Sequence, residues 1–222
     1  MVPWIRARVQ LVNALRKEFI RFCEKARHGN IIGQMRMRFL NFIRNHYREV
    51  LLFCADELLP SGKEPKNLVL TYGGINLFDL KVESIRDPSY LNLERLKKSR
   101  ERRDRGDKLL TLRDEDGRIC HCSWVRTSHG FVDIGELGES IQGLAEGELT
   151  IVFDCWTDPS MRGKGLYPWG IRYIANRAIE NGSTCWIYCM RWNRPSRRGI
   201  EKAGFRCFGL YKRFFIFTGR LN

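Results

Sequence analysis

Hydrophobic and polar residues follow a helical period at the start of the chain and a strand period further along. Over residues 9–23 apolar side chains recur at spacings of three, four and seven, and basic side chains occupy much of the remaining surface. A turn at 28–30 interrupts this pattern, and a second basic stretch rich in aromatic residues follows over 35–47. The pattern predicts a basic amphipathic helical extension, 1–47, ahead of a domain over 48–222.

From residue 48 onward, short apolar runs bounded by turn residues predict strands, and longer mixed stretches predict helices. The strongest strand candidates are "REVLLFCADE", "LTIVFDCWTD" and "TCWIYCMRW". "KLLTLRDEDGRICHCSWVRT" predicts a hairpin, because its central Asp116-Gly117 pair tolerates the positive φ of a tight turn. Helices are expected over 91–105, from Gly165 to about 181, and over 196–202, with extended chain over 67–82 and 205–217 and a loop over 130–148.

Composition restricts the classes of protein to which the chain can belong. With 222 residues, 43% of them hydrophobic, it can bury one substantial core, which excludes a wholly disordered chain. No stretch approaches the roughly 20 apolar residues of a spanning helix, and residues 1–8 lack the pattern of a secretory signal. We therefore expect a cytoplasmic protein, either soluble or peripheral to the inner membrane.

Most of the net charge of +14 lies in the first 48 residues, which hold eleven Lys and Arg against Glu18 and Glu24. A basic amphipathic helix binds anionic lipid when its cations and apolar side chains act together. The same pattern also occurs in a helix that docks on a neighbouring domain and keeps its charged face in water. Two interpretations of residues 1–47 therefore stand: a peripheral membrane contact and a docked helical hairpin.

Eight cysteines are expected to act as small buried hydrophobic residues in a reducing compartment, because a chain of this length does not need disulfides. Cys120-His121-Cys122 is similar to a set of metal ligands. However, alternate residues of a strand share a face, so His121 should point away from both cysteines, and no second pair lies at zinc-finger spacing. No metal site is expected.

The stretch "RGKGLYPWGI" (162–171) is the strongest candidate for binding chemistry. It follows a predicted strand and opens a predicted helix, so unpaired N–H groups should converge there at the positive end of the helix dipole. Gly163 and Gly165 let a phosphate approach the backbone, and Arg162 and Lys164 add positive charge. Neither a complete Walker loop nor a dinucleotide fingerprint is present. A pyrophosphate fits such a turn.

Two motifs in this part of the chain resemble the GNAT superfamily of N-acetyltransferases. They are "DPSMRGKGLYP" and "NRPSRRGIEKAGF" (193–205), and the resemblance covers roughly 108–217. It implies a fold of the α/β (α+β) class, with a mixed, mostly antiparallel central sheet flanked by helices. The wording of "GRICHCSWV" and "RGIEKAGF" is similar to a bacterial branch associated with cell-surface glycan synthesis. Arg162 and Gly165 match the GNAT turn, but Tyr167 occupies its last small position.

The resemblance implies that acetyl-CoA is the acyl donor. Backbone groups at the end of the strand would pair with the pantetheine amides and polarise the thioester carbonyl. Amides of the turn would hold the pyrophosphate, and an Asn would line the pantetheine arm. The implied cofactor-binding residues are Cys155, Trp156, Thr157, Arg162, Gly163, Lys164, Gly165, Leu166, Tyr167 and Asn193.

Acetyl transfer by direct attack needs a neutral amine and a proton for the departing thiolate. Asp154 is the candidate general base, and an ion pair with an arginine is its alternative role. Its rivals are Glu136, Glu146, Glu148 and Asp158.

Ser196 is the candidate general acid. Many GNAT relatives carry a tyrosine five residues before the Phe of the Gly-Phe pair, and that position is Ile200 here. Ser196 matches the variant in which a serine hydroxyl meets the thiolate, and it is equally suited to cap a helix. Tyr167 and Tyr188 are the other candidate donors.

The resulting hypothesis is transfer of an acetyl group from acetyl-CoA to an amine in a ternary complex, with an amino sugar as one candidate acceptor. The alternative is a degenerate GNAT fold that binds nucleic acid or a membrane surface through its positive charge and loses affinity steeply with salt. The intact phosphate turn favours the enzyme, so no nucleic-acid partner is expected, and the oligomeric state stays open.

Overall fold

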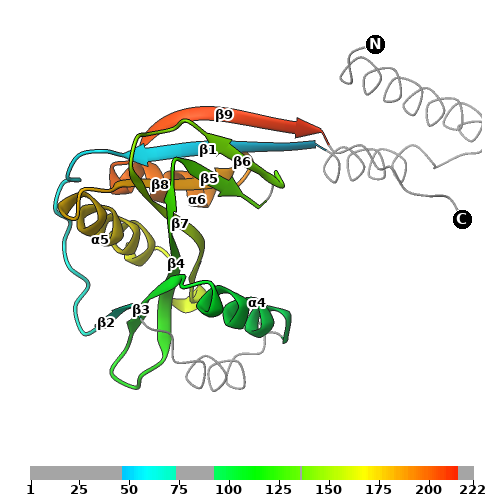
Figure 1. The fold of residues 1–222 in the computed structure, drawn as a ribbon. Helices are drawn as coiled ribbons and strands as arrows, with labels where there is room; N and C mark the ends of the chain where they lie inside the picture. The colour runs from blue at the N-terminus through cyan, green and yellow to red at the C-terminus, as the bar shows by residue number, and fades with distance from the viewer. Residues whose placement is uncertain (1–46, 74–92, 136, 215–222) are drawn as a thin grey trace, which may run out of the picture. The chain divides into compact units, whose positions relative to one another are not determined.

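The structure is a computed structural model that describes residues 47–73, 93–135 and 137–214 (Figure 1). The basic extension predicted over 1–47 lies outside the described residues except for Tyr47. Among the described helices, none combines the length and the apolar character needed to cross a membrane.

The chain divides into two compact units. The larger is Val50–Tyr211, and the smaller combines Met1–Glu49 with Lys212–Asn222. Within the described part of the smaller unit, Lys212 Nζ lies 3.4 Å from Glu49 Oε1, and the Tyr47 hydroxyl donates to the same oxygen at 2.8 Å. All the catalytic and cofactor-binding residues predicted from the sequence belong to the larger unit.

A seven-stranded sheet in the order β2-β3-β4-β7-β8-β1-β9 is the frame of the larger unit. Strands β7 and β8 run parallel, whereas the pairs β1–β8, β2–β3, β3–β4 and β4–β7 are antiparallel. This arrangement confirms the predicted fold class. The strands of the sheet are β1 (Tyr47–Ala55), β2 (Val69–Gly73), β3 (Lys108–Arg113), β4 (Ile119–His129), β7 (Glu148–Thr157), β8 (Thr184–Met190) and β9 (Arg206–Phe214).

The first strand of the described residues, β1, lies inside the sheet. β1 sits between β8 and β9, and its pairing with β8 runs from Val50↔Met190 to Ala55↔Cys185. Leu52 and Phe53 are both completely buried, and they belong to hydrophobic clusters on opposite faces of the sheet. A strand covered on both faces needs a continuous apolar run, which is why "REVLLFCADE" predicted it.

Two helices cover one face of the sheet. Ile171, Ile174 and Ile200 of these helices pack against Val152 and Ile187 of the strands, and all five side chains are almost fully buried. Each such side chain contributes about 1.5–3 kcal/mol to stability. A third helix, α4, lies beside β4 and β7 on the opposite side of the sheet (Figure 1). The helices are α4 (Leu93–Asp104), α5 (Leu166–Glu180) and α6 (Arg194–Ala203), with a 3₁₀ turn, η1 (Pro159–Met161), before α5.

The loop predicted over 130–148 is wrong in its centre, because this stretch contains a two-stranded sheet. Its strands are β5 (Phe131–Ile134) and β6 (Glu139–Gln142). Val132 and Ile134 are completely buried on the face opposite α5 and α6, where they pack in the cluster that includes Leu52 and Trp186. The glycines that suggested a loop at 130, 138, 143 and 147 have positive φ and lie between the strands. They make it difficult to recognise in the sequence the short alternation of apolar residues that covers this face of the core.

The β3–β4 hairpin is confirmed, but its turn differs from the predicted two-residue connection. Five residues, Asp114–Arg118, join the strands, and the Gly117 N–H donates to the Asp114 carbonyl at 3.0 Å. Gly117 has a φ of 76°, whereas Asp116 does not adopt a positive φ. The wider turn also lets the Arg118 N–H donate to the Asp114 carboxylate at 2.8 Å, so Asp116 needs no left-handed conformation.

A bulge in β4 changes the faces of the Cys120-His121-Cys122 stretch. Leu112 pairs with His121 and Arg113 with Ile119, so Cys120 is the extra residue of the bulge. Cys120 belongs to the core cluster on the α5 face, whereas Cys122 belongs to the cluster on the opposite face. The expectation that the two cysteines share a face is therefore wrong. Within the described ranges, no group of three or more ligand side chains is arranged to hold a metal ion.

His121 is completely buried beneath α5. Its Nδ1 lies 2.8 Å from Thr157 Oγ1 and its Nε2 lies 2.9 Å from Ser123 Oγ. A Cβ at Gly170 of α5 would lie 2.9 Å from Nε2, so the missing side chain lets the helix approach the ring. Desolvation lowers the pKa of His121 from 6.5 to about 3.

The His121 ring should stay neutral in the folded protein down to pH 5. Because its folded pKa is about 3, the unfolded chain binds this proton between pH 6.5 and 3 while the folded chain does not. The stability it contributes is complete above pH 6.5 and is lost as the pH falls, by up to about 1.4 kcal/mol per pH unit. NMR titration of the ring measures this directly, and a midpoint near pH 6.5 in the folded protein would contradict it.

Candidate active site

The parallel strands β7 and β8 stop pairing halfway along their length. Their register runs from Leu149↔Thr184 to Val152↔Ile187 and ends there, although β7 continues to Thr157 beside β4, and β8 continues to Met190 beside β1. A point where neighbouring strands turn to different partners, at the carboxyl ends of parallel strands, is where α/β sheets bind ligands. The second half of β7 and the turn that follows it are therefore the candidate ligand-binding region.

A bulge at Asp154 reshapes this half of β7. Trp124 pairs with Phe153 and Cys122 with Trp156, so three residue steps of β7 oppose two steps of β4. Asp154 has a φ of 44°, a left-handed conformation that a non-glycine residue rarely adopts. The bulge interrupts the ladder, so backbone groups next to Asp154 are turned out of the regular pairing.

An ion pair between α4 and β7 stands at this bulge. Arg102 donates from Nη1 to the Asp154 carboxylate at 2.7 Å, and its guanidinium lies 4.9 Å from the ring centre of Trp124 and 5.1 Å from that of Phe153. The Arg102 side chain is 14% exposed and that of Asp154 is 43% exposed. A guanidinium that lies close to two aromatic rings is held in place by packing as well as by charge. Arg102 is therefore a well-ordered partner for the carboxylate of Asp154.

The turn between β7 and α5 is built for close approach to its backbone. Gly163 and Gly165 have φ values of 79° and 83°, and Gly165 is the N-cap of α5 with no side chain to cap the helix. The first N–H groups of a helix have no partner inside it, and here no side chain replaces one. The exposed side chains of Arg162 and Lys164 add two positive charges beside this dipole end.

The residues of the turn fit the pyrophosphate of a nucleotide cofactor. A Cβ added at Gly163 or Gly165 would meet no atom within 4 Å, so the space beside the backbone is open. Backbone N–H groups, a helix dipole and two cations are the partners that phosphate prefers in proteins. The turn therefore has the features of an anion-binding site, and it follows β7 after the short η1.

The helix α6 starts two residues earlier than predicted. Asn193 is its N-cap and accepts from the Ser196 N–H at 3.2 Å, so Ser196 itself lies inside the first turn and does not cap the helix. The Ser196 hydroxyl instead lies 3.0 Å from the Tyr167 hydroxyl of α5. Two hydroxyl groups from the helices α5 and α6 thus meet.

No protein-family model matches the chain, and no curated protein is similar to it in sequence. Solved structures with the same fold are found. An acetyltransferase from the GNAT family of Colwellia psychrerythraea matches with a TM-score of 0.54 and 13% identity, over 80% of this chain and 60% of its own. A GCN5-related N-acetyltransferase from Sphaerobacter thermophilus gives a TM-score of 0.53 and 13% identity, over 80% of this chain and 57% of its own.

The chain has a GNAT fold. It spans 60% and 57% of the lengths of these two structures, so the likeness covers the shared fold and leaves a large part of each neighbour unmatched. The fold agrees with the resemblance carried by the two sequence motifs. The β7–α5 turn and the start of α6, which carry those motifs, lie on the same side of the sheet.

In this GNAT fold the predicted cofactor-binding residues face different ways. Leu166 is buried in the core, and Cys155 packs on the α5 face of the sheet, where burial raises the pKa of its thiol to about 12. Trp156 packs on the opposite face, and Thr157 hydrogen-bonds to His121. These four residues can therefore meet a cofactor through backbone groups, as the resemblance implied.

The rival carboxylates lie in other settings. Asp158 caps η1 by accepting from the Ser160 N–H at 2.8 Å. Glu148 opens β7 beside His129, about 20 Å from Asp154 at the rise of an extended strand. Glu146 is exposed in the preceding turn, and Glu136 lies outside the described residues. Asp154 is the candidate base that stands at the bulge.

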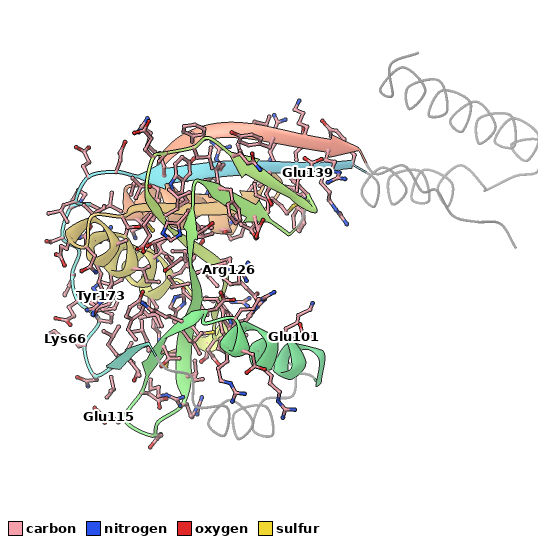
Figure 2. The ribbon with its side chains drawn as sticks, viewed as in Figure 1. Lys66, Glu101, Glu115, Arg126, Glu139 and Tyr173 are labelled. Carbon is pink, nitrogen blue, oxygen red and sulfur yellow. The ribbon has the colours of Figure 1, made fainter. Side chains whose placement is uncertain are left out.

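The sequence analysis did not identify Arg126, a basic residue on the face of the sheet opposite α5. Arg126 of β4 donates to both oxygens of Asp107 at 2.8 Å, lies 3.7 Å from the Asp133 carboxylate and stacks 5.1 Å from the ring centre of Phe153. Figure 2 shows Arg126 in the middle stretch of β4, between α4 and the β5–β6 hairpin. The signal was faint, because a single Arg in a strand is indistinguishable from a surface residue until its partners are placed.

Asn193→Ala should lower the free energy of unfolding by about 1 kcal/mol without any ligand, because it removes the cap of α6. Asn193→Asp keeps an accepting oxygen and should cost much less. Urea unfolding of the three proteins measures both effects. An alanine variant as stable as the wild type would show that the side chain does not hold the helix.

Proposed function

We propose that the chain is an acetyl-CoA-dependent N-acetyltransferase that acetylates an amine by direct attack in a ternary complex. One observation carries the proposal: the uncapped N-terminus of α5, with left-handed Gly163 and Gly165, follows directly on the strand β7 that has lost its pairing with β8. A strand that its parallel neighbour leaves, followed by a turn with the features of an anion site, suits a ligand with an amide-containing arm at one end and a pyrophosphate at the other.

The residues of the turn would hold the pyrophosphate through the backbone N–H groups of 163–167, assisted by the side chains of Arg162 and Lys164. Backbone groups of Cys155–Thr157 would pair with the pantetheine arm, on the side of β7 that β8 leaves. Acetyl-CoA supplies an acetyl group activated as a thioester. N–H groups at the Asp154 bulge would donate to its carbonyl oxygen, where negative charge develops during attack.

The acceptor is proposed to be an amine, and amino sugars are the first class to screen. Asp154 would take the proton that the nitrogen sheds, because its carboxylate stands at the bulge and is 43% exposed. The ion pair with Arg102 joins this carboxylate to α4. The departing thiolate needs a proton, and the hydroxyl pair of Ser196 and Tyr167 is the proposed source.

Gly165→Asp should abolish the binding of acetyl-CoA, because it places a carboxylate where the pyrophosphate would lie. At about 100 times its dissociation constant the ligand should stabilise the wild type by about 2.7 kcal/mol, seen as a rise in Tm. Gly182→Asp is the matched control: Gly182 has a φ of 77° just beyond the other end of α5 and open space around its Cα. It carries the same strain and charge, and it should keep the shift.

The same measurement decides against the binding-module alternative. Plain pyrophosphate should raise Tm less than acetyl-CoA does, because it lacks the arm that pairs with β7. Equal shifts from pyrophosphate and acetyl-CoA, with binding that falls steeply as salt rises, would replace the enzyme with a general polyanion-binding protein.

Asp154→Asn should lower kcat by about 100-fold or more, with partial recovery at high pH, where the amine loses its proton to solvent. Arg102→Met is the control, since it removes the ion pair but leaves the carboxylate, and it should keep most of kcat. Steady-state rates across pH separate the two roles. Equal losses in both variants, with an unchanged pH profile, would show that Asp154 only anchors α4.

A further inference from the structure

Tyr167 occupies the place that a small residue would take in the turn motif, and its side chain is directed into the site. It is the second residue of α5, and its hydroxyl lies 3.0 Å from Ser196 Oγ on α6. The ring lies against Gly199, where an added Cβ would collide with ring carbons. A glycine inside a helix costs about 1 kcal/mol relative to alanine, so Gly199 is explained by the space that the Tyr167 ring needs.

Tyr167 packs in the core cluster that also holds Cys155 of β7 and Cys189 of β8. Cys155 lies three residues beyond Val152, and Cys189 lies two residues beyond Ile187, the last pair that joins β7 to β8. The thiols of both cysteines act electrostatically on the Tyr167 hydroxyl, and Ser196 lies close to the Cys189 thiol. The phenol therefore lies close to the parts of β7 and β8 beyond their last pair, where the pantetheine arm is proposed to run.

A phenol suits the protonation of a thiolate better than an alcohol does. The ordinary pKa of tyrosine is about 10 and that of a thiol is about 8.5, whereas an aliphatic hydroxyl is a far weaker acid. Burial raises the pKa of Tyr167 well above 10, the Cys155 thiol raises it further, and the hydrogen bond with Ser196 lowers it. The phenol thus keeps its proton at neutral pH, and Ser196 favours its release.

We propose that Tyr167 is the proton donor to the departing CoA sulfur and that Ser196 is a positioning residue, which donates its own hydrogen to the phenol oxygen. This inference rests on the proposed function. The amine nitrogen bonds to the acetyl carbon, the carbon–sulfur bond breaks, and the sulfur takes the electron pair and the Tyr167 proton. Asp154 takes the proton from nitrogen, and solvent returns one to the phenolate, so the net transfer is from nitrogen to sulfur.

The inference also accounts for Ile200. This position, where many GNAT relatives carry a tyrosine, is a completely buried core residue here and has no polar atom to offer. Tyr167 of α5 instead places a phenol against the first turn of α6. Gly199, directly before Ile200, provides the room for it.

Tyr167→Phe should lower kcat by about 100-fold and change the KM for acetyl-CoA by less than about threefold, because only the proton donor is removed. Tyr173→Phe is the matched control, since it removes a hydroxyl from the same helix at a residue that stacks on Trp169, and it should leave both constants unchanged. Gly199→Ala, which displaces the ring, should reproduce the loss of kcat. Full activity in Tyr167→Phe overturns the proposal.

A binding measurement tests the contact with sulfur without any acceptor. At pH 9 the wild type should bind free CoA about tenfold more tightly than desulfo-CoA, because a phenol stabilises the thiolate by a charge-assisted hydrogen bond. In Tyr167→Phe the two ligands should bind within about threefold of each other. Tight binding of both ligands with the same ratio in wild type and variant overturns the role of Tyr167 alone. No binding of either ligand to the wild type overturns the proposed function.

Discussion

The site depends on the short parallel pairing of β7 with β8. Four residue pairs hold the two strands together, and each strand then follows its antiparallel neighbour, β4 or β1. If the pairing continued, the backbone groups of Cys155–Thr157 would be hydrogen-bonded to β8. The helix α5 would then begin next to a fully paired strand. Because it ends, β8 does not pair with Cys155–Thr157, and α5 begins after this part of β7. The bulge at Asp154 adds to this local change in pairing, because it shifts the register of β7 against β4 just beyond the last residue that pairs with β8.

Most of the frame could be predicted from the sequence, since it depends on local signals. The helix after Gly165, the strand "TCWIYCMRW" and the hairpin around Gly117 each follow from periodicity and turn residues, and the two motifs identified the fold. The β5–β6 hairpin could not be predicted in the same way. Its buried Val132 and Ile134 are too few to produce a period, and they contribute to the core only by packing in one cluster with residues of β1, β7 and β8.

The same division applies to the site. The phosphate turn is local, so its glycines and cations were readable one after another along the chain. The partners of the predicted catalytic groups come from far away: Arg102 reaches Asp154 across 52 positions, and Tyr167 reaches Ser196 across 29. Pairings of this kind depend on how the sheet carries α4, α5 and α6, and single-residue chemistry does not reveal them. The ion pair that was an alternative role for Asp154 is therefore present, and it coexists with the proposed role.

The interior position of β1 has a consequence for how this protein is made. Its partner β8 lies 130 residues later, from Ala55 to Cys185, and β9 follows β8. During synthesis at about 5–20 residues per second, the "VLLFCA" segment waits roughly 6 to 26 seconds before its neighbour exists. An apolar strand with both edges unpaired is the kind of segment that chaperones bind and that aggregates when they do not. The nascent chain can therefore bury this segment inside the sheet only after β8 and β9 have been synthesised.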